Sequence, residues 1–214
     1  MKHFNKIFVT GIDTDAGKTY ATAWLARLLM AQGKSVITQK FIQTGNEGYS
    51  EDIERHRALM GVEPFPEDID HTTAPIIFSY PASAQLAARI DGREIDLSLI
   101  EASTAKLAAK YDTVLIEGAG GLMVPVTDTY FTVDYIESHH LPVALVTNGK
   151  LGSINHTVLT LEALKNRGID VVCLLYSRHL DTYATIAADT FGFINRYMKR
   201  HFPDAEIIEV PVFS

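Results

Sequence analysis

Residues Gly11 to Thr19, with the sequence GIDTDAGKT, decide the fold that the rest of the chain is expected to adopt. An apolar run, Ile7 to Thr10, precedes this stretch, and a segment with apolar residues at helical spacing follows it. Small residues free backbone N–H groups for polyphosphate oxygens, and the positive end of the following helix strengthens the attraction. Lys18 would reach the terminal phosphates, and the Thr19 hydroxyl would bind Mg2+. The stretch therefore predicts a phosphate-binding loop.

The loop is a variant of the usual pattern, which is Gly, four residues, then Gly-Lys-Ser/Thr. Ile12 stands at the position of the first glycine, and Gly11 lies one residue earlier. A chance Gly-Lys-Thr in a surface turn is the alternative. The strand expected before the motif and the amphipathic helix expected after it favour the phosphate loop.

Composition limits the classes of protein to consider. The chain has 214 residues, 47% of them apolar, which is enough for one well-cored domain and short for two, so residues 1–214 are expected to form one domain. The net charge is −7, and lysine and arginine form no block. This pattern argues against partners such as nucleic acid or an anionic membrane and favours small molecules.

The single cysteine and the N-terminal segment indicate the compartment. Cys173 lies inside the apolar run Val171 to Leu175, where a buried structural thiol is expected rather than a nucleophile or a ligand. The apolar run before Asp13 is too short for a signal peptide, and no run has the length that spans a membrane. We therefore expect a cytoplasmic protein.

Strands and helices are expected to alternate along the chain. The expected strands are Phe4–Thr10, Ser35–Gln39, Ala74–Ser79, Thr113–Ile116, Pro142–Thr147, Val171–Tyr176 and Ile207–Val212. The expected helices are Lys18 up to a stop at Gly33, Glu51–Met60 after a Ser50 cap, Ala82–Ile90, Leu97–Ala109, Phe131–Ser138, Ser153–Arg167 and Thr182–His201. The segments 41–50 and 117–121 are expected to be loops, and the Pro-rich, acidic segment 61–73 carries no assignment.

This alternation predicts the α/β class with a parallel sheet and helices on both faces, because parallel crossovers require an intervening helix and are right-handed. Ligands of such folds bind at the carboxyl ends of the strands. Four segments that follow expected strands should therefore meet at one edge: Gly11–Thr19, Lys40–Thr44, Glu117–Gly121 and Lys150–Ser153.

Four motifs in this order, GIDTDAGKT, KFIQTG, EGAGG followed by PVTDT, and KLGSINH, resemble those of the dethiobiotin synthetases of biotin biosynthesis. The resemblance covers nearly the whole chain. It implies a P-loop NTPase-like single domain, a homodimer, and a ligase that converts 7,8-diaminopelargonic acid, CO2 and MgATP into dethiobiotin, ADP and phosphate. The chemistry agrees, because a carbamate is a poor electrophile until it is phosphorylated, and phosphoryl transfer needs positioning and charge rather than a protein nucleophile.

The resemblance also implies which residues act. Lys18 and Lys40 would flank the transferred phosphoryl group, and Thr14 and Asp15 would help to seat the substrate. A solvated surface lysine is the alternative for Lys40, and Phe41 stands where the family usually has proline. The residues expected to bind the nucleotide are Gly11, Asp13, Thr14, Asp15, Ala16, Gly17, Lys18, Thr19, Glu117, Gly118, Gly120, Tyr176, Ser177, Pro211 and Val212.

Magnesium is expected on Thr19, Asp52 and Glu117, since these three segments offer the hard oxygen atoms that Mg2+ prefers and Mg2+ keeps several waters. For Asp52 the alternative is a capping or dipole role at a helix start.

Asp13 and Asp15 would repel phosphates unless a cation lay between them, and a diamine substrate would supply that cation.

The substrate carboxylate is expected at the start of the helix at Ser153, where the N–H groups of Ile154 and Asn155 are free. An ordinary N-cap is the alternative for Ser153. The residues expected to bind the substrate are Thr44, Gly120, Gly121, Gly152, Ser153, Ile154 and Asn155. The histidines show no metal-ligand spacing, so none is assigned to catalysis.

The identity of the base stays open, because the family often has Asn where this chain has the sequence YSR, residues 176–178. Glu209–Phe213 matches the family's terminal Pro-containing loop beside the purine, although an edge strand would look the same. Two other classes share the phosphate loop. A partitioning-type ATPase usually has a lysine early in that loop, where Ile12 and Asp13 stand here, and a glutamine-dependent amidase needs a domain with a nucleophilic cysteine.

Overall fold

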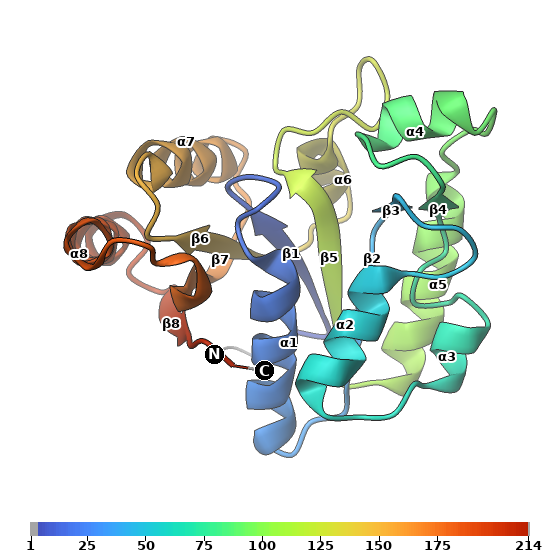
Figure 1. Ribbon diagram of the computed structural model, residues 1–214, viewed down its shortest axis with the longest axis horizontal. Coiled ribbons are helices and arrows are strands. Elements are labelled where there is room, and N and C mark those ends of the chain that lie inside the picture. Colours follow the sequence, from blue (N-terminus) through green and yellow to red (C-terminus); the bar gives the residue numbers. More distant parts are fainter. Residues whose placement is uncertain (1–3, 214) are drawn as a thin grey trace.

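The computed structural model describes residues 4–213 and is built on a six-stranded parallel sheet with the order β2-β5-β1-β6-β7-β8 (Figure 1). The strands are β1 Lys6–Gly11, β2 Val36–Lys40, β5 Thr113–Gly121, β6 Val143–Asn148, β7 Val171–Ser177 and β8 Glu206–Val210, and β3 Gln43–Thr44 and β4 Ile77–Phe78 form a separate pair. The helices are α1 Lys18–Ala31, α2 Glu51–Met60, α3 Pro66–Ile69, α4 Ala84–Ile90, α5 Leu97–Lys110, α6 Thr132–Ser138, α7 Ser153–Asn166, η1 Arg178–Leu180 and α8 Ala184–His201.

Helices cover both faces of this sheet, as the alternating pattern predicts. In β1 the side chains of Ile7 and Val9 pack into one apolar layer with α1 and α2, whereas Phe8 packs into the other layer with α5, α7 and α8. Successive side chains of a strand point to opposite faces, so a run of apolar residues is needed when both faces are buried. The predicted α/β class is confirmed.

The central strand β1 sets the position of the phosphate loop. It pairs with β5 on one side and β6 on the other, so the loop after Gly11 leaves the middle of the sheet at its carboxyl edge. Ligands of open parallel sheets bind at this point, where the connections from adjacent strands diverge.

The strand β5 is longer than the sequence predicts. It continues through Glu117–Gly121, which was expected to be a loop, instead of ending at Ile116. Gly11 pairs with Gly121, and a Cβ added at Gly118 would lie 2.9 Å from Cε1 of Phe8. These glycines allow close packing against β1. The expected loop is therefore the last part of a strand, and Glu117 lies within the sheet.

Other boundaries differ less. The expected strand Ala74–Ser79 is reduced to β4, which pairs with β3 inside the expected loop 41–50, and segment 61–73 contains α3. The strand expected to end at Val212 is β8, which ends at Val210, before Pro211. Cys173 is fully buried, and burial raises its pKa to about 12, as a structural thiol requires. Within the described part of the chain, no helix has both the length and the apolar character needed to cross a membrane.

Candidate functional site at the carboxyl edge of the sheet

The phosphate loop has the strand–loop–helix geometry that the sequence predicts. Gly17 precedes α1 with φ of 93°, and a Cβ there would lie 2.8 Å from Oγ of Ser177, so both backbone and packing require glycine. The Lys18 side chain is only 5% exposed, and its ammonium donates to the carbonyl oxygens of Asp13 at 3.0 Å and Thr14 at 2.9 Å. The alternative of a surface turn is therefore wrong.

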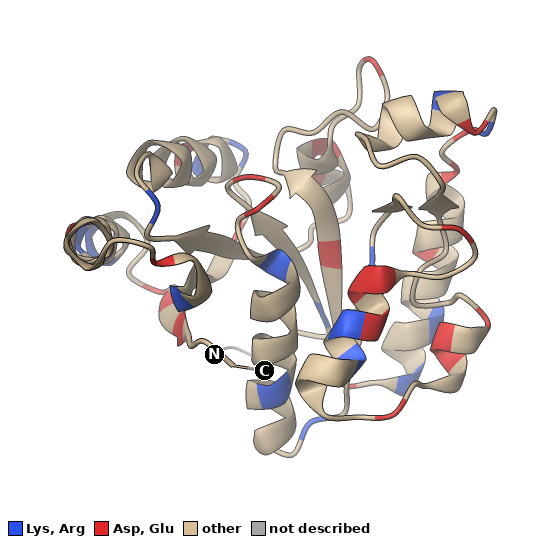
Figure 2. Cartoon of the chain, viewed as in Figure 1, with Lys and Arg blue, Asp and Glu red and all other residues tan. Residues whose placement is uncertain are grey.

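A second lysine lies among carboxylates beside this loop. Lys40 ends β2 and is paired in register with Glu117 of β5, while Asp52 comes from the first turn of α2. The Lys40 Nζ atom lies 2.5 Å from Oδ2 of Asp52 and 2.9 Å from Oε1 of Glu117. Figure 2 shows charged positions of both signs where β5 faces the start of α2. Lys40 is 5% exposed, so the alternative of a solvated surface lysine is wrong.

The capping alternative for Asp52 is also wrong. Oγ of Ser50 accepts from the N–H of Ile53 and caps α2, as expected, whereas the Asp52 side chain reaches Lys40 and Thr19. Asp52 thus faces the site, and its position in the first turn of a helix still suits its charge.

Electrostatics keep this cluster charged. Burial opposes the charge of Lys40, but the carboxylates of Glu117 and Asp52 raise its pKa above the usual value. Burial likewise opposes the charge of Glu117, and the Lys40 ammonium together with the His56 ring holds the pKa of that carboxyl well below its usual range. Burial, followed by the charge of Lys40, lowers the pKa of Lys18 to about 8. Two cations and two carboxylates therefore line one edge of the sheet near neutral pH.

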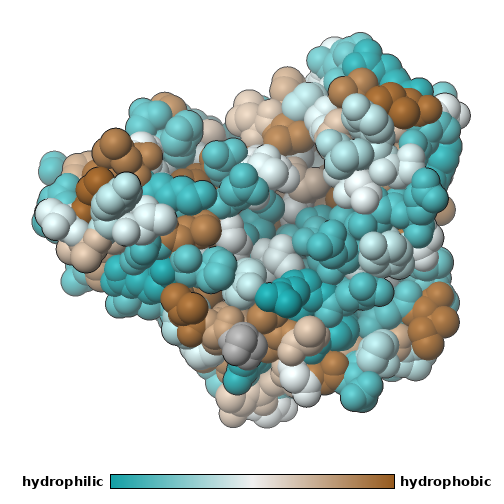
Figure 3. Space-filling model, viewed as in Figure 1, coloured by the Kyte–Doolittle hydropathy of each residue, from teal (hydrophilic) through white to brown (hydrophobic). Residues whose placement is uncertain are grey.

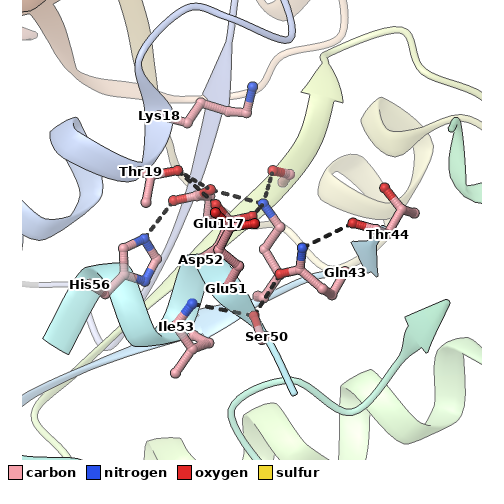
Figure 4. A network of polar contacts seen from close by, with 12 residues as sticks. Lys18, Thr19, Gln43, Thr44, Ser50, Glu51, Asp52, Ile53, His56 and Glu117 are labelled. Carbon is pink, nitrogen blue, oxygen red and sulfur yellow. Dashed lines mark hydrogen bonds and ion pairs between the residues drawn. The ribbon is translucent and has the colours of Figure 1, made fainter. Parts of the chain in front are cut away.

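The oxygen atoms of this cluster fit Mg2+. Oγ1 of Thr19 lies 2.9 Å from Oδ1 of Asp52 and 3.3 Å from Oε1 of Glu117, so three hard donors from three elements converge (Figure 4). Among residues 4–213, no group of three or more His, Cys, Asp and Glu side chains is arranged to hold a metal ion. Two carboxylates and a hydroxyl suit Mg2+, which keeps several waters and shares phosphate oxygens.

These groups open into a cavity of about 490 Å3. Figure 3 shows hydrophilic residues gathered near the centre of the face onto which α1 and α2 project. The residues expected from sequence that line the cavity are Thr14, Asp15, Gly17, Lys18, Thr19, Lys40, Thr44, Asp52, Glu117 and Gly120. Gly11, at the end of β1, and Ala16, in the loop, are both buried, and the Gly118 carbonyl lies 3.4 Å from Nζ of Lys40.

The segment Gly152–Asn155 does not line this cavity. Gly152 precedes α7, and the Ser153 hydroxyl donates to Oδ1 of Asn148 at 2.7 Å, so the N-cap alternative for Ser153 is wrong. Nζ of Lys150 lies 3.4 Å from the carbonyl oxygen of Asp15, which places this segment beside the phosphate loop. A second hollow, of about 340 Å3, is lined by Asp13 and Gly121 together with Met123, His156 and Leu159.

The residues expected near the base are less accessible. Tyr176 is fully buried, and its hydroxyl donates to the Ala187 carbonyl at 3.0 Å. Oγ of Ser177 is buried and has no hydrogen-bond partner within residues 4–213. Pro211 is partly buried, and Val212 is 69% exposed after the end of β8.

Four further side chains at the site were not expected from sequence. The rings of Tyr20 and His179 stack at 4.3 Å, and Nη2 of Arg55 donates to the Tyr20 hydroxyl at 2.6 Å, so these residues wall one side of the cavity. His56 lies behind Glu117, with Nε2 2.7 Å from Oε2. Arg55 and His56 follow Asp52 at three and four residues, a helical spacing that indicates a shared face.

Comparisons with known proteins agree with this geometry. Residues 5–202 match the family model described as an AAA domain. The chain is 49% identical over 197 residues to the ATP-dependent dethiobiotin synthetase BioD 2 of Pasteurella multocida, which covers 92% of each chain. It is 53% identical over 171 residues to BioD 2 of Haemophilus influenzae, covering 80% of this chain and 90% of the other.

The chain belongs to the ATP-dependent dethiobiotin synthetase family. Chlorobaculum tepidum has a further member, BioD, that is 46% identical over 203 residues and matches 94% of this chain and 85% of its own. The structure of FlhF complexed with GMPPNP and Mg2+ has a TM-score of 0.50 and 16% identity, over 89% of this chain and 62% of that one, and shows a shared fold. As a dethiobiotin synthetase the chain is an ATP-dependent ligase, which decides against the partitioning ATPase and the glutamine-dependent amidase.

Proposed function

We propose that this chain, as one domain over residues 1–214, closes 7,8-diaminopelargonic acid and CO2 into dethiobiotin while it converts MgATP to ADP and phosphate. The observation that carries the proposal is the buried position of Lys40. This buried cation stands opposite Lys18 and between Asp52 and Glu117, at the point where a phosphate loop opens into the cavity. A cytoplasmic location stays a prediction.

The reaction requires three bond-forming steps. One amine of the substrate adds to CO2 and loses a proton, which gives a carbamate. A carbamate oxygen then attacks the γ-phosphorus of ATP, and the bond to ADP breaks. The second amine attacks the carbonyl of the carbamic–phosphoric anhydride and loses a proton, phosphate leaves, and a cyclic urea remains. Each step develops charge on oxygen, so fixed cations suffice and no protein nucleophile is needed.

The residues of the cavity match these demands. Lys18 would stabilise the charge on the transferred phosphoryl group. Lys40 would do the same after its ammonium moves away from the carboxylates of Asp52 and Glu117. Thr19, Asp52 and Glu117 would hold Mg2+, which when bound would neutralise phosphate charge. Asp13 and Asp15 are exposed residues of the loop itself, where the ammonium form of a diamine would meet their carboxylates. Thr14, Thr44 and Gly120 would contact the same substrate.

We place the substrate carboxylate at the start of α7 in a second copy of the chain. The segment Gly152–Asn155 is separate from the cavity of its own chain, yet Leu151 is 86% exposed and Leu159 is 61% exposed around it. A two-fold contact would bury these apolar side chains and bring the free N–H groups of one copy to the cavity of the other. The active form would then be a homodimer with shared sites.

Product analysis tests the proposed reaction. The enzyme is incubated with 7,8-diaminopelargonic acid, 13C-labelled bicarbonate and MgATP, and the products are separated by mass spectrometry. We expect one labelled dethiobiotin for each ADP and phosphate formed. The Lys18→Ala variant, which lacks the loop cation, is the matched control and should give neither product. ATP hydrolysis without a labelled cyclic urea would exclude the proposed function.

A further inference from the structure

His56 is a fully buried polar side chain that the proposed reaction does not use. It lies on α2 one helical turn after Asp52, so both side chains point toward Glu117 on β5 (Figure 4). Nε2 of His56 is 2.7 Å from Oε2 of Glu117. Because both groups are buried, this contact restricts the orientation of the Glu117 carboxylate.

The direction of this hydrogen bond follows from the charge of its partner. The Glu117 carboxylate is ionised, because the Lys40 ammonium lies 2.9 Å from its Oε1, and an ionised carboxylate only accepts. Nε2 of His56 must therefore carry the hydrogen, whatever the state of Nδ1. Oε2 of Glu117 is committed to His56, which leaves Oε1 facing Lys40 at 2.9 Å and Thr19 at 3.3 Å.

Further contacts hold the imidazole from behind. Nδ1 of His56 is 3.0 Å from Oγ1 of Thr38 on β2, and that oxygen accepts from Nη1 of Arg57 at 2.7 Å. Two hydrogen bonds of 2.8 Å join the Arg57 guanidinium to the Asp68 carboxylate on α3. His56 and Arg57 are both buried, at 0% and 3% exposure. The ring is thus held at both nitrogens: Nε2 contacts Glu117, and Nδ1 contacts Thr38, behind which Arg57 pairs with Asp68.

We propose that His56 is a positioning residue that fixes Glu117 so that Oε1 alone faces the magnesium and phosphate side of the site. This inference rests on the proposed metal role of Glu117. Removing a partner that orients a metal ligand typically lowers the metal affinity 10- to 100-fold. The loss should appear as weaker coupling between metal and nucleotide, since Lys18 and the loop backbone remain in place.

Calorimetric binding of the non-hydrolysable analogue AMPPNP, with and without Mn2+, measures this coupling. The gain in AMPPNP affinity caused by Mn2+ is compared among wild type, His56→Leu, His56→Asn and His56→Gln. A glutamine amide reaches the position of Nε2 and can donate to Glu117, whereas an asparagine amide reaches only the position of Nδ1. We expect the gain to fall about tenfold or more in His56→Leu and His56→Asn and to recover in His56→Gln.

Matched measurements separate the outcomes. Thr22→Val, which removes a buried hydroxyl without a hydrogen-bond partner among the described residues, is the control and should keep the full gain. The inference is overturned if His56→Asn shows the wild-type gain, or if His56→Gln is as weak as His56→Asn. If His56→Leu does not fold, the Gln and Asn pair still decides. If wild type and Glu117→Gln show the same gain, the proposed metal role of Glu117 fails instead.

Discussion

Replacing Lys40 by Met removes the cation that the two carboxylates share. Nζ of Lys40 lies 2.5 Å from Asp52 and 2.9 Å from Glu117, and the side chains of Lys40 and Glu117 are 6% and 1% exposed. Methionine keeps a similar volume and places no charge there. Glu117 would keep its hydrogen bond to His56, but its charge would lose its nearest compensating cation.

The magnitude follows from this burial. Removing one partner of a buried ion pair costs about 3–5 kcal/mol, because the remaining charge is left uncompensated. For a chain of this size each kcal/mol shifts Tm by roughly 2–4 °C, so Lys40→Met should lower Tm by roughly 6–20 °C in EDTA. Millimolar Mg2+ should restore part of the loss, since the metal would supply positive charge at the same oxygens.

Circular dichroism melts in EDTA and in Mg2+ measure both effects. Lys165→Met, on the exposed face of α7, is the matched control and should change stability by no more than about 0.5 kcal/mol. A Tm of Lys40→Met within the range of the control, or an Mg2+ response equal to that of wild type, would refute the reasoning.

Turnover of Lys40→Gln should fall on the order of a hundredfold, since one preorganised cation is lost.

Three further outcomes are expected. The pKa of Lys18 is about 8 instead of 10.5, so raising the pH through 8 removes its proton, whereas bound phosphates favour the protonated form. ATP binding at pH 8 should therefore take up about half a proton per site, since Lys18 is half protonated at that pH, and should weaken at higher pH. Calorimetry in two buffers of different ionisation enthalpy detects this uptake, and its absence contradicts the lowered pKa. Because Oγ of Ser177 is buried away from the cavity, discrimination between ATP and other triphosphates should be weak in competition assays, and strict ATP selectivity would speak against this. Mixing inactive Lys18→Ala with inactive Asn155→Trp should restore part of the activity, since one hybrid site contains neither lesion; a mixture that stays inactive after verified subunit exchange would exclude shared sites.

The helix and strand pattern could be predicted because it depends on neighbours in the chain. The expected helices begin or end within two residues of those observed, since caps and apolar spacing are local signals. The segment Glu117–Gly121 was assigned wrongly because its glycines indicate a loop by themselves. Their place in β5 depends on β1, to which Gly121 pairs through Gly11.

The sequence by itself determined the phosphate loop, the α/β class and the motifs shared with dethiobiotin synthetases, because those signals are short runs of residues. Only the tertiary structure decided that Lys40 is buried between two carboxylates and that His56 holds Glu117, from which it is separated by 61 positions. It also decided that Tyr20 and His179 meet at the cavity. Burial and side-chain contacts of this kind arise when distant strands and helices pack together, so no local pattern of residues encodes them.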